Sequence, residues 1–184
     1  MSSLCLSPTG PGRRLSIPRV LACVLGVLLL TALPGSRAEA LTANSPAPEF
    51  SLQSLEGAQT SLTDYRGKYL LLNFWATWCG PCKIEMPSLE YLHRKFKNKN
   101  LNVVAVSNDM FGRRVVKPYI QAQNLTFPVL LDPQATASKL YGVNSLPTTF
   151  LIDPQGTIIG ILNGAENWAE PETVLYFENL LSAP

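Results

Sequence analysis

The sequence predicts an α/β fold in which helices flank a central sheet. Residues 69–75 and 101–106 are apolar runs of strand length, and helical periodicity occupies the segment between them. Two strands joined by a helix favour a parallel pair with a crossover connection. The length of 184 residues suits one well-buried domain and is short for two. We therefore expect a single domain over residues 49–184, behind an N-terminal extension.

The first 40 residues have the order of a secretory signal. Arg13, Arg14 and Arg19 precede an apolar run over residues 20–33, and small residues follow up to Ala40. We expect cleavage after Ala40 and a periplasmic or otherwise extracytoplasmic domain. An uncleaved membrane anchor is the alternative, because the uncharged stretch continues to residue 36. Membrane association is expected only if this leader is retained.

Charge and cysteine content change once the leader is set aside. It contains four of the fifteen Lys and Arg residues and one of the thirteen Asp and Glu residues. Eleven basic and twelve acidic side chains remain, a net charge of −1. A near-neutral domain without a basic stripe gives no reason to expect nucleic acid as a partner. Cys5 and Cys23 also belong to the leader, which leaves Cys79 and Cys82.

The elements outside the central pair follow from local composition. Residues 41–48 are small, polar and proline-containing, which predicts a flexible spacer. A short hairpin is expected around Glu56-Gly57. Trp168 is expected to pack at the start of the last helix. The second half predicts a helix over residues 118–123, a strand over 127–131, a helix over 136–141, a hairpin of strands 148–152 and 157–162, and a helix over 168–181.

The helix between the two central strands is expected from Cys79 to Lys97. Pro87 should kink it, because proline removes an amide donor and clashes with the preceding turn. Its inward positions are expected to be Met86, Leu89, Leu92 and Phe96, and its water-facing positions Lys83, Glu90, Arg94 and Lys95.

Two cysteines separated by two residues stand at the start of this helix, within FWATWCGPCKIEMP. A structural zinc site needs about four Cys or His ligands, and only His93 is available to join the pair, so structural zinc is excluded. We expect His93 to be solvated or half-buried on the helix. A disulfide within the pair closes a loop too short to stabilise the fold by restricting the unfolded chain.

The position at a helix start instead indicates redox chemistry. Free backbone amides and the positive end of the helix dipole stabilise a thiolate at Cys79. Cys82, one turn further on, can attack a mixed disulfide formed at Cys79 and release the partner. A CxxC between a strand and a helix therefore predicts reversible dithiol exchange.

The chain resembles the thioredoxin superfamily, and within it the extracytoplasmic thiol-disulfide oxidoreductases of the TlpA/ResA type. The resemblance covers residues 46–181. It implies a thioredoxin fold, with a central mixed sheet, helices on both faces, an N-terminal hairpin and a TlpA-type insertion over residues 108–140. It rests on the stretches PAPEFSL, LLLNFWATWCGPCKIEMP, FPVLLDP, YGVNSLPTTFLIDPQG and NGAENW.

The resemblance also implies roles for the residues around the pair. Cys79 is the exposed attacking thiol and Cys82 the resolving thiol of a redox-active disulfide. Pro147 is implied to be a cis-proline that faces this disulfide, and Leu146 keeps its backbone free for a substrate strand. Further contacts with the substrate are expected from Trp78, Gly80 and Pro81.

An acidic residue near the pair is implied as well. Asn73 stands where thioredoxin has a buried acid, and an amide cannot exchange a proton. Glu85 matches the acid of the family pattern CxxCxxExP and lies at i+3 from Cys82, so it can receive the proton that Cys82 must lose. The alternative is an exposed glutamate that the helix dipole stabilises.

The expected activity is reduction of protein disulfides without a cofactor or a bound metal. Gly80-Pro81 matches the dipeptide of reducing thioredoxins. The resemblance implies a membrane thiol-electron donor and, as one acceptor, the CxxCH disulfide of apocytochrome c. Two alternatives are a metallochaperone that binds Cu(I) between two thiolates and a peroxiredoxin-like peroxidase. The peroxidase would need a Thr and an Arg around a lone cysteine, which TWCGPC does not present.

Overall fold

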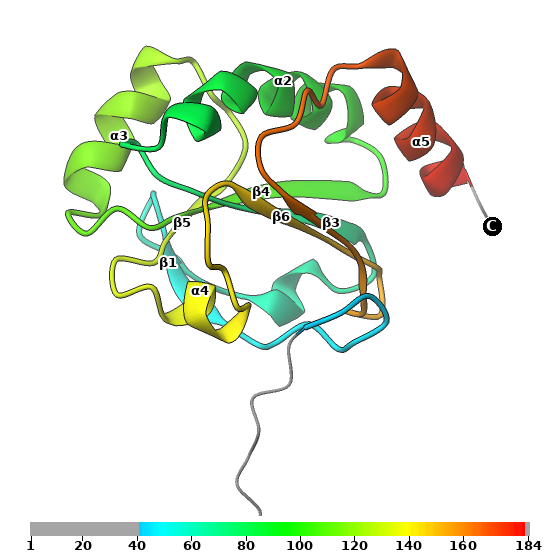
Figure 1. Ribbon diagram of the computed structural model, residues 1–184, viewed down its shortest axis with the longest axis horizontal. Coiled ribbons are helices and arrows are strands. Elements are labelled where there is room, and N and C mark those ends of the chain that lie inside the picture. Colours follow the sequence, from blue (N-terminus) through cyan, green and yellow to red (C-terminus); the bar gives the residue numbers. More distant parts are fainter. Residues whose placement is uncertain (1–40, 183–184) are drawn as a thin grey trace, which may run out of the picture. The chain divides into compact units, whose positions relative to one another are not determined.

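The computed structural model describes residues 41–182, which form one seven-stranded mixed sheet with helices on both faces (Figure 1). The predicted leader lies outside these residues. Among those described, no helix is long and apolar enough to cross a membrane. The elements are β1 (Ser51–Ser54), β2 (Gln59–Ser61), the 3-10 helix η1 (Leu62–Tyr65), β3 (Tyr69–Trp75), α2 (Gly80–Phe96), β4 (Leu101–Ser107), α3 (Arg113–Ala122), β5 (Val129–Leu131), α4 (Thr136–Leu140), β6 (Thr148–Ile152), β7 (Ile158–Asn163) and α5 (Pro171–Ser182).

The strand order is β2-β1-β5-β4-β3-β6-β7. The predicted parallel pair is present. Strands β3 and β4 pair directly and run parallel, and the crossover helix α2 connects them along the chain. Strand β5 extends the parallel group beyond β4, and the other strand pairs are antiparallel. The stretch 108–140 supplies α3, β5 and α4, so part of the expected insertion belongs to the sheet itself.

Alternation along β3 separates two cores. Leu71 and Trp75 belong to the core under α2, α3 and α5. Leu70, Leu72 and Phe74 point to the opposite face, where η1 and α4 pack. The helices are divided in the same way in Figure 1, which has α2, α3 and α5 on one face and α4 on the other. Since both faces are covered, β3 is apolar along most of its length.

Helix α2 follows the predicted pattern, with one correction. Its four expected inward residues are buried, and Pro87 lies inside the helix. Glu90 was expected to face water but is buried, and its carboxylate accepts hydrogen bonds from the N–H and hydroxyl of Thr126 and from Arg94. Burial alone would raise the pKa of Glu90, but these hydrogen bonds outweigh it and lower the pKa.

Two helix starts differ from prediction. Helix α3 begins at Arg113 and contains Pro118, which we had expected to open the helix. Burial of Val116 and Ile120, one turn apart, stabilises the helix on both sides of the proline. Helix α5 begins at Pro171, so Trp168 lies in the preceding loop. Proline has no amide donor and a fixed φ, which suits a first helical position.

The predicted spacer over residues 41–48 is not a flexible linker. Asn44 and Ser45 exchange backbone hydrogen bonds with Ile158, and the Ala47 N–H donates to the Gly156 carbonyl. Ala47 is buried, and the Tyr141 hydroxyl donates to the Pro48 carbonyl at 2.9 Å. Composition suggested a linker because the segment is held through its backbone groups, and backbone hydrogen bonds require no particular side chains that a sequence pattern could reveal.

Removal of this segment should destabilise the domain. A chain that begins at Glu49 should lose roughly 3 kcal/mol of unfolding free energy relative to a chain that begins at Leu41, because several hydrogen bonds of about 1 kcal/mol each are lost. Urea unfolding followed by circular dichroism measures the difference. Equal midpoints for the two chains would show that the segment adds nothing to stability.

Candidate active site

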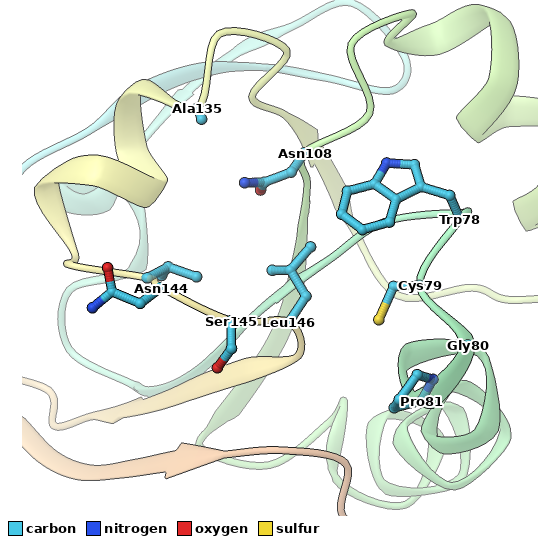
Figure 2. Close-up of a pocket in the computed structure, with 10 residues that line it drawn as sticks. Trp78, Cys79, Gly80, Pro81, Asn108, Ala135, Asn144, Ser145 and Leu146 are labelled. Atoms are coloured by element: carbon cyan, nitrogen blue, oxygen red, sulfur yellow. The ribbon is translucent and has the colours of Figure 1, made fainter.

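A groove of about 690 Å³ lies where the N-terminus of α2 meets the loop before β6 (Figure 2). Trp78, Cys79 and Pro81 line one side, and Leu146 lines the other. Trp78 is 68% exposed, so its ring is available at the rim. The complete lining is Trp78, Cys79, Gly80, Pro81, Asn108, Ala135, Val143, Asn144, Ser145 and Leu146.

The two cysteines form a disulfide and differ in access. Cys79 is the N-cap of α2, and its sulfur accepts a hydrogen bond from the Cys82 N–H at 3.2 Å. Cys79 is 6% exposed and lines the groove, whereas Cys82 is fully buried and does not. Cys79 is thus less open than expected, because the loop with Leu146 lies across from it. The helix N-terminus favours negative charge at the Cys79 sulfur when the pair is reduced.

The Leu146–Pro147 peptide bond is cis, as the resemblance implied. Pro147 is buried, and its carbonyl accepts the Gly164 N–H at 2.9 Å. Leu146 lines the groove, and within residues 41–182 its backbone N–H and carbonyl form no hydrogen bond. The structure therefore brings Leu146 into the groove with Cys79, whereas Pro147 is buried and does not line it.

Glu85 lies on α2 one turn after Cys82 and is only 1% exposed, so the exposed alternative was wrong. Its Oε1 accepts from Asn73 Nδ2 at 2.8 Å, and its Oε2 accepts from the Glu166 N–H at 3.1 Å and from Trp168 Nε1 at 3.3 Å. Burial raises the pKa of Glu85, and the charge of Glu166 adds to the rise. The three hydrogen bonds oppose this change without cancelling it.

Sequence reasoning missed the part that Trp168 plays here. We expected it only to pack; it is buried, but it also donates to Glu85, and its backbone N–H donates to Ser88. Trp168 and Glu85 are 83 residues apart, so no local spacing connects them. The stretch NGAENW carried the family resemblance without indicating which of its atoms would reach the site.

A second buried carboxylate holds the turn before the cysteines, and the sequence did not reveal it. Asp109 accepts hydrogen bonds from the N–H and hydroxyl of Thr77 at 2.9 and 2.6 Å, and one from the hydroxyl of Ser107. Because β3 and β4 are in parallel register, with Trp75 opposite Ser107, the chain segments that follow them lie close together. Asp109 thereby fixes the backbone next to Trp78.

His93 is half-buried on α2, as expected, with its ring edge-on to Phe127. Within residues 41–182, no group of three or more His, Cys, Asp or Glu side chains lies where it could share a metal ion.

Stability should depend on pH through Glu85. Its folded pKa is raised above the unfolded value, so its stabilising contribution is complete below the unfolded pKa and is lost as the pH rises through the folded pKa. Glu85→Gln cannot titrate and should lack this loss. Urea unfolding of both oxidised proteins from about pH 4 to about pH 8 tests this, and parallel curves would contradict the assignment.

The chain is similar to known proteins over most of its length. Residues 43–161 match the AhpC/TSA family. Thiol-disulfide oxidoreductase ResA of Bacillus subtilis (strain 168) is 36% identical over 151 residues, which are 82% of this chain and 83% of that protein. ResA of Geobacillus thermodenitrificans (strain NG80-2) is 42% identical over 125 residues, 68% of this chain and 71% of that protein.

Solved structures agree with this assignment. StoA from Bacillus subtilis superposes with a TM-score of 0.60 at 26% identity, over 72% of this chain and 96% of that one. A thioredoxin-family thiol:disulfide interchange protein from Chlorobium tepidum TLS gives 0.62 at 28% identity, over 75% and 98%. With a CxxC disulfide at the start of α2 and a buried acid beneath it, the chain belongs to the thioredoxin-like AhpC/TSA family and, within it, to the ResA-type thiol-disulfide oxidoreductases.

Proposed function

We propose that this thiol-disulfide oxidoreductase reduces disulfide bonds of other proteins outside the cytoplasm, with Cys79 as the nucleophile and Cys82 as the resolving thiol. The observation that carries the proposal is the unequal access of the two sulfurs. Only Cys79 lines the groove, and the Cys79–Cys82 disulfide is the product that a completed reduction leaves behind.

The reaction has two exchange steps. The Cys79 thiolate attacks one sulfur of the substrate disulfide, and the other sulfur leaves as a thiolate and takes a proton from water. Cys82 then loses its proton and attacks the Cys79 sulfur, which expels the second substrate thiolate. Two electrons pass to the substrate, and the enzyme pair becomes the disulfide.

Glu85 is the proposed acceptor of the Cys82 proton. Both side chains are buried on one face of α2, at i and i+3, which places the carboxyl near the buried thiol. A raised pKa brings the carboxyl nearer to the ordinary pKa of a thiol, which makes the transfer less unfavourable. Trp168 Nε1 and the Glu166 N–H donate hydrogen bonds to Oε2 of Glu85 and hold the carboxyl in place.

The groove is the proposed docking site for an extended stretch of the substrate. The free backbone groups of Leu146 can pair with a strand laid beside Cys79. Pro147 has no amide donor of its own, so the pairing is confined to its neighbour. Trp78, Gly80 and Pro81 supply an apolar rim opposite.

Reduction is the proposed direction, because Gly80-Pro81 is the dipeptide of reducing thioredoxins. A reductase in an oxidising compartment must itself be reduced again, for which a membrane thiol-electron donor is the proposed source. An apocytochrome c CxxCH disulfide is the proposed acceptor within cytochrome c maturation. The leader supports the location, through its basic, apolar and small-residue order.

Cys82→Ser should trap substrates as mixed disulfides at Cys79, because the resolving thiol is gone. Cys79→Ser is the matched control and should trap none, since Cys82 is buried. Non-reducing electrophoresis and mass spectrometry of the exported protein detect the adducts. Equal capture by both variants would contradict the assigned roles.

Redox titration of the native protein tests the direction. The potential should lie nearer the roughly −270 mV of thioredoxin than the roughly −120 mV of DsbA. A value above about −150 mV would indicate an oxidase. Failure to reduce a model protein disulfide, together with tight Cu(I) binding, would favour the metallochaperone alternative.

Residues 1–45 should export a reporter that is active only outside the cytoplasm. A matched fusion with Arg13, Arg14 and Arg19 replaced by Glu should be exported less, because it lacks the basic segment of the signal. Reporter activity in culture measures both. An inactive native fusion would contradict the proposed location.

A further inference from the structure

The carboxyl of Glu85 accepts three hydrogen bonds, and none of the three atoms that donate them can accept one in return. Asn73 Nδ2 donates to one oxygen, and the Glu166 N–H and Trp168 Nε1 donate to the other. This arrangement satisfies the carboxylate. The protonated acid must donate its own O–H, yet each oxygen is already met by an N–H group.

Two of the three donors cannot become acceptors. A backbone N–H and an indole Nε1–H donate in every state. Asn73 is different, because its amide carries a donor and an acceptor at similar distances from the same carbon, and rotation exchanges them. It is therefore the single partner of Glu85 that can meet either protonation state.

Asn73 also has an acceptor to spare. The residue is fully buried, and its Oδ1 forms no hydrogen bond with any group in the part of the chain that the structure describes. Its Nδ2 makes two bonds, to Glu85 and to the Thr149 hydroxyl at 2.9 Å. Thr149 lies directly opposite Asn73 in the register of β3 and β6.

We propose that the Asn73 amide rotates by half a turn when Glu85 takes up a proton, so that Oδ1 replaces Nδ2 in front of the carboxyl. Oδ1 then accepts from the Glu85 O–H and from the Thr149 hydroxyl, which can donate as well as accept. Two hydrogen bonds exist before the rotation and two after it, and the group left without a partner changes from Oδ1 to Nδ2. Asn73 is thus a positioning residue that directs the proton of Glu85 to Oε1.

The role of this rotation in exchange rests on the proposed function. When Cys82–S–H passes its proton to the carboxylate, a thiolate and a neutral acid result, and the net charge of the buried pair is unchanged. The rotated amide holds the proton on Glu85 while the Cys82 thiolate attacks. Within residues 41–182, the charged side chain that acts on Glu85 from neighbouring elements is Glu166; Asn73 and Thr149 bring no charge from β3 and β6.

Two variants of the oxidised protein test the proposal, because neither cysteine titrates in that state. Carbon-13 NMR of the carboxyl reports the Glu85 titration. Trp168→Phe removes a donor only and should raise the pKa of Glu85 by about half to one pH unit. Asn73→Leu removes a group that bonds to the carboxylate and, after the rotation, to the protonated acid, so it should change the pKa of Glu85 less than Trp168→Phe does. An amide that cannot rotate would give the opposite order, because the Asn73 hydrogen bond is the shorter one, at 2.8 Å against 3.3 Å for Trp168. A larger rise in Asn73→Leu would overturn the proposal.

The native protein provides a measurement that needs no variant. As the pH falls through the Glu85 midpoint, both side-chain amide protons of Asn73 should move upfield, because Nδ2 turns away from Glu85 and Thr149 together. A fixed amide would shift the proton that faces Glu85 and keep the one that faces Thr149, and that result would overturn the rotation. Because both tests use the oxidised protein, they hold or fail independently of the reductase assay.

Discussion

The structure around the active pair depends on one buried carboxyl. Glu85 joins three parts of the chain: helix α2 that carries it, strand β3 through Asn73, and the loop before α5 through Glu166 and Trp168. A buried acid without partners would cost several kcal/mol, so these hydrogen bonds are needed to keep it in place. The same contacts hold the first turns of α2 against the sheet.

Burial of this acid balances stability against reactivity. Loss of solvent raises the pKa of Glu85, and the three donors restrain that rise. A fully solvated carboxylate would be too weak a base for a thiol proton, whereas an unsatisfied buried one would weaken the fold. In the proposed mechanism, the cost in stability is therefore located at the group that accepts the Cys82 proton.

Parallel pairing of β3 and β4 assembles the rest of the groove. Both strands end at the same edge of the sheet, so the turn before Cys79 and the segment after Ser107 lie close together, and Asp109 bonds both to Thr77 and to Ser107. The antiparallel partner β6 begins at this edge, which brings Leu146 opposite Cys79. Topology thereby joins segments that are far apart in sequence.

Local chemistry in the sequence by itself determined the main elements and the reactive pair. Strand β3, helix α2 and the position of Cys79 at its N-terminus follow from apolar periodicity and from a motif only a few residues long. The cis bond at Pro147 required the resemblance, since composition does not distinguish it from the other prolines.

Tertiary structure alone decided which distant groups meet. The contact of Trp168 with Glu85, the hydrogen bonds of buried Glu90 with Thr126 and the pairing of residues 44–47 with residues 156–158 were not predictable. Side-chain partners of this kind are selected by the packing of whole elements, and backbone hydrogen bonds are compatible with almost any residue, so neither leaves a pattern in the local sequence.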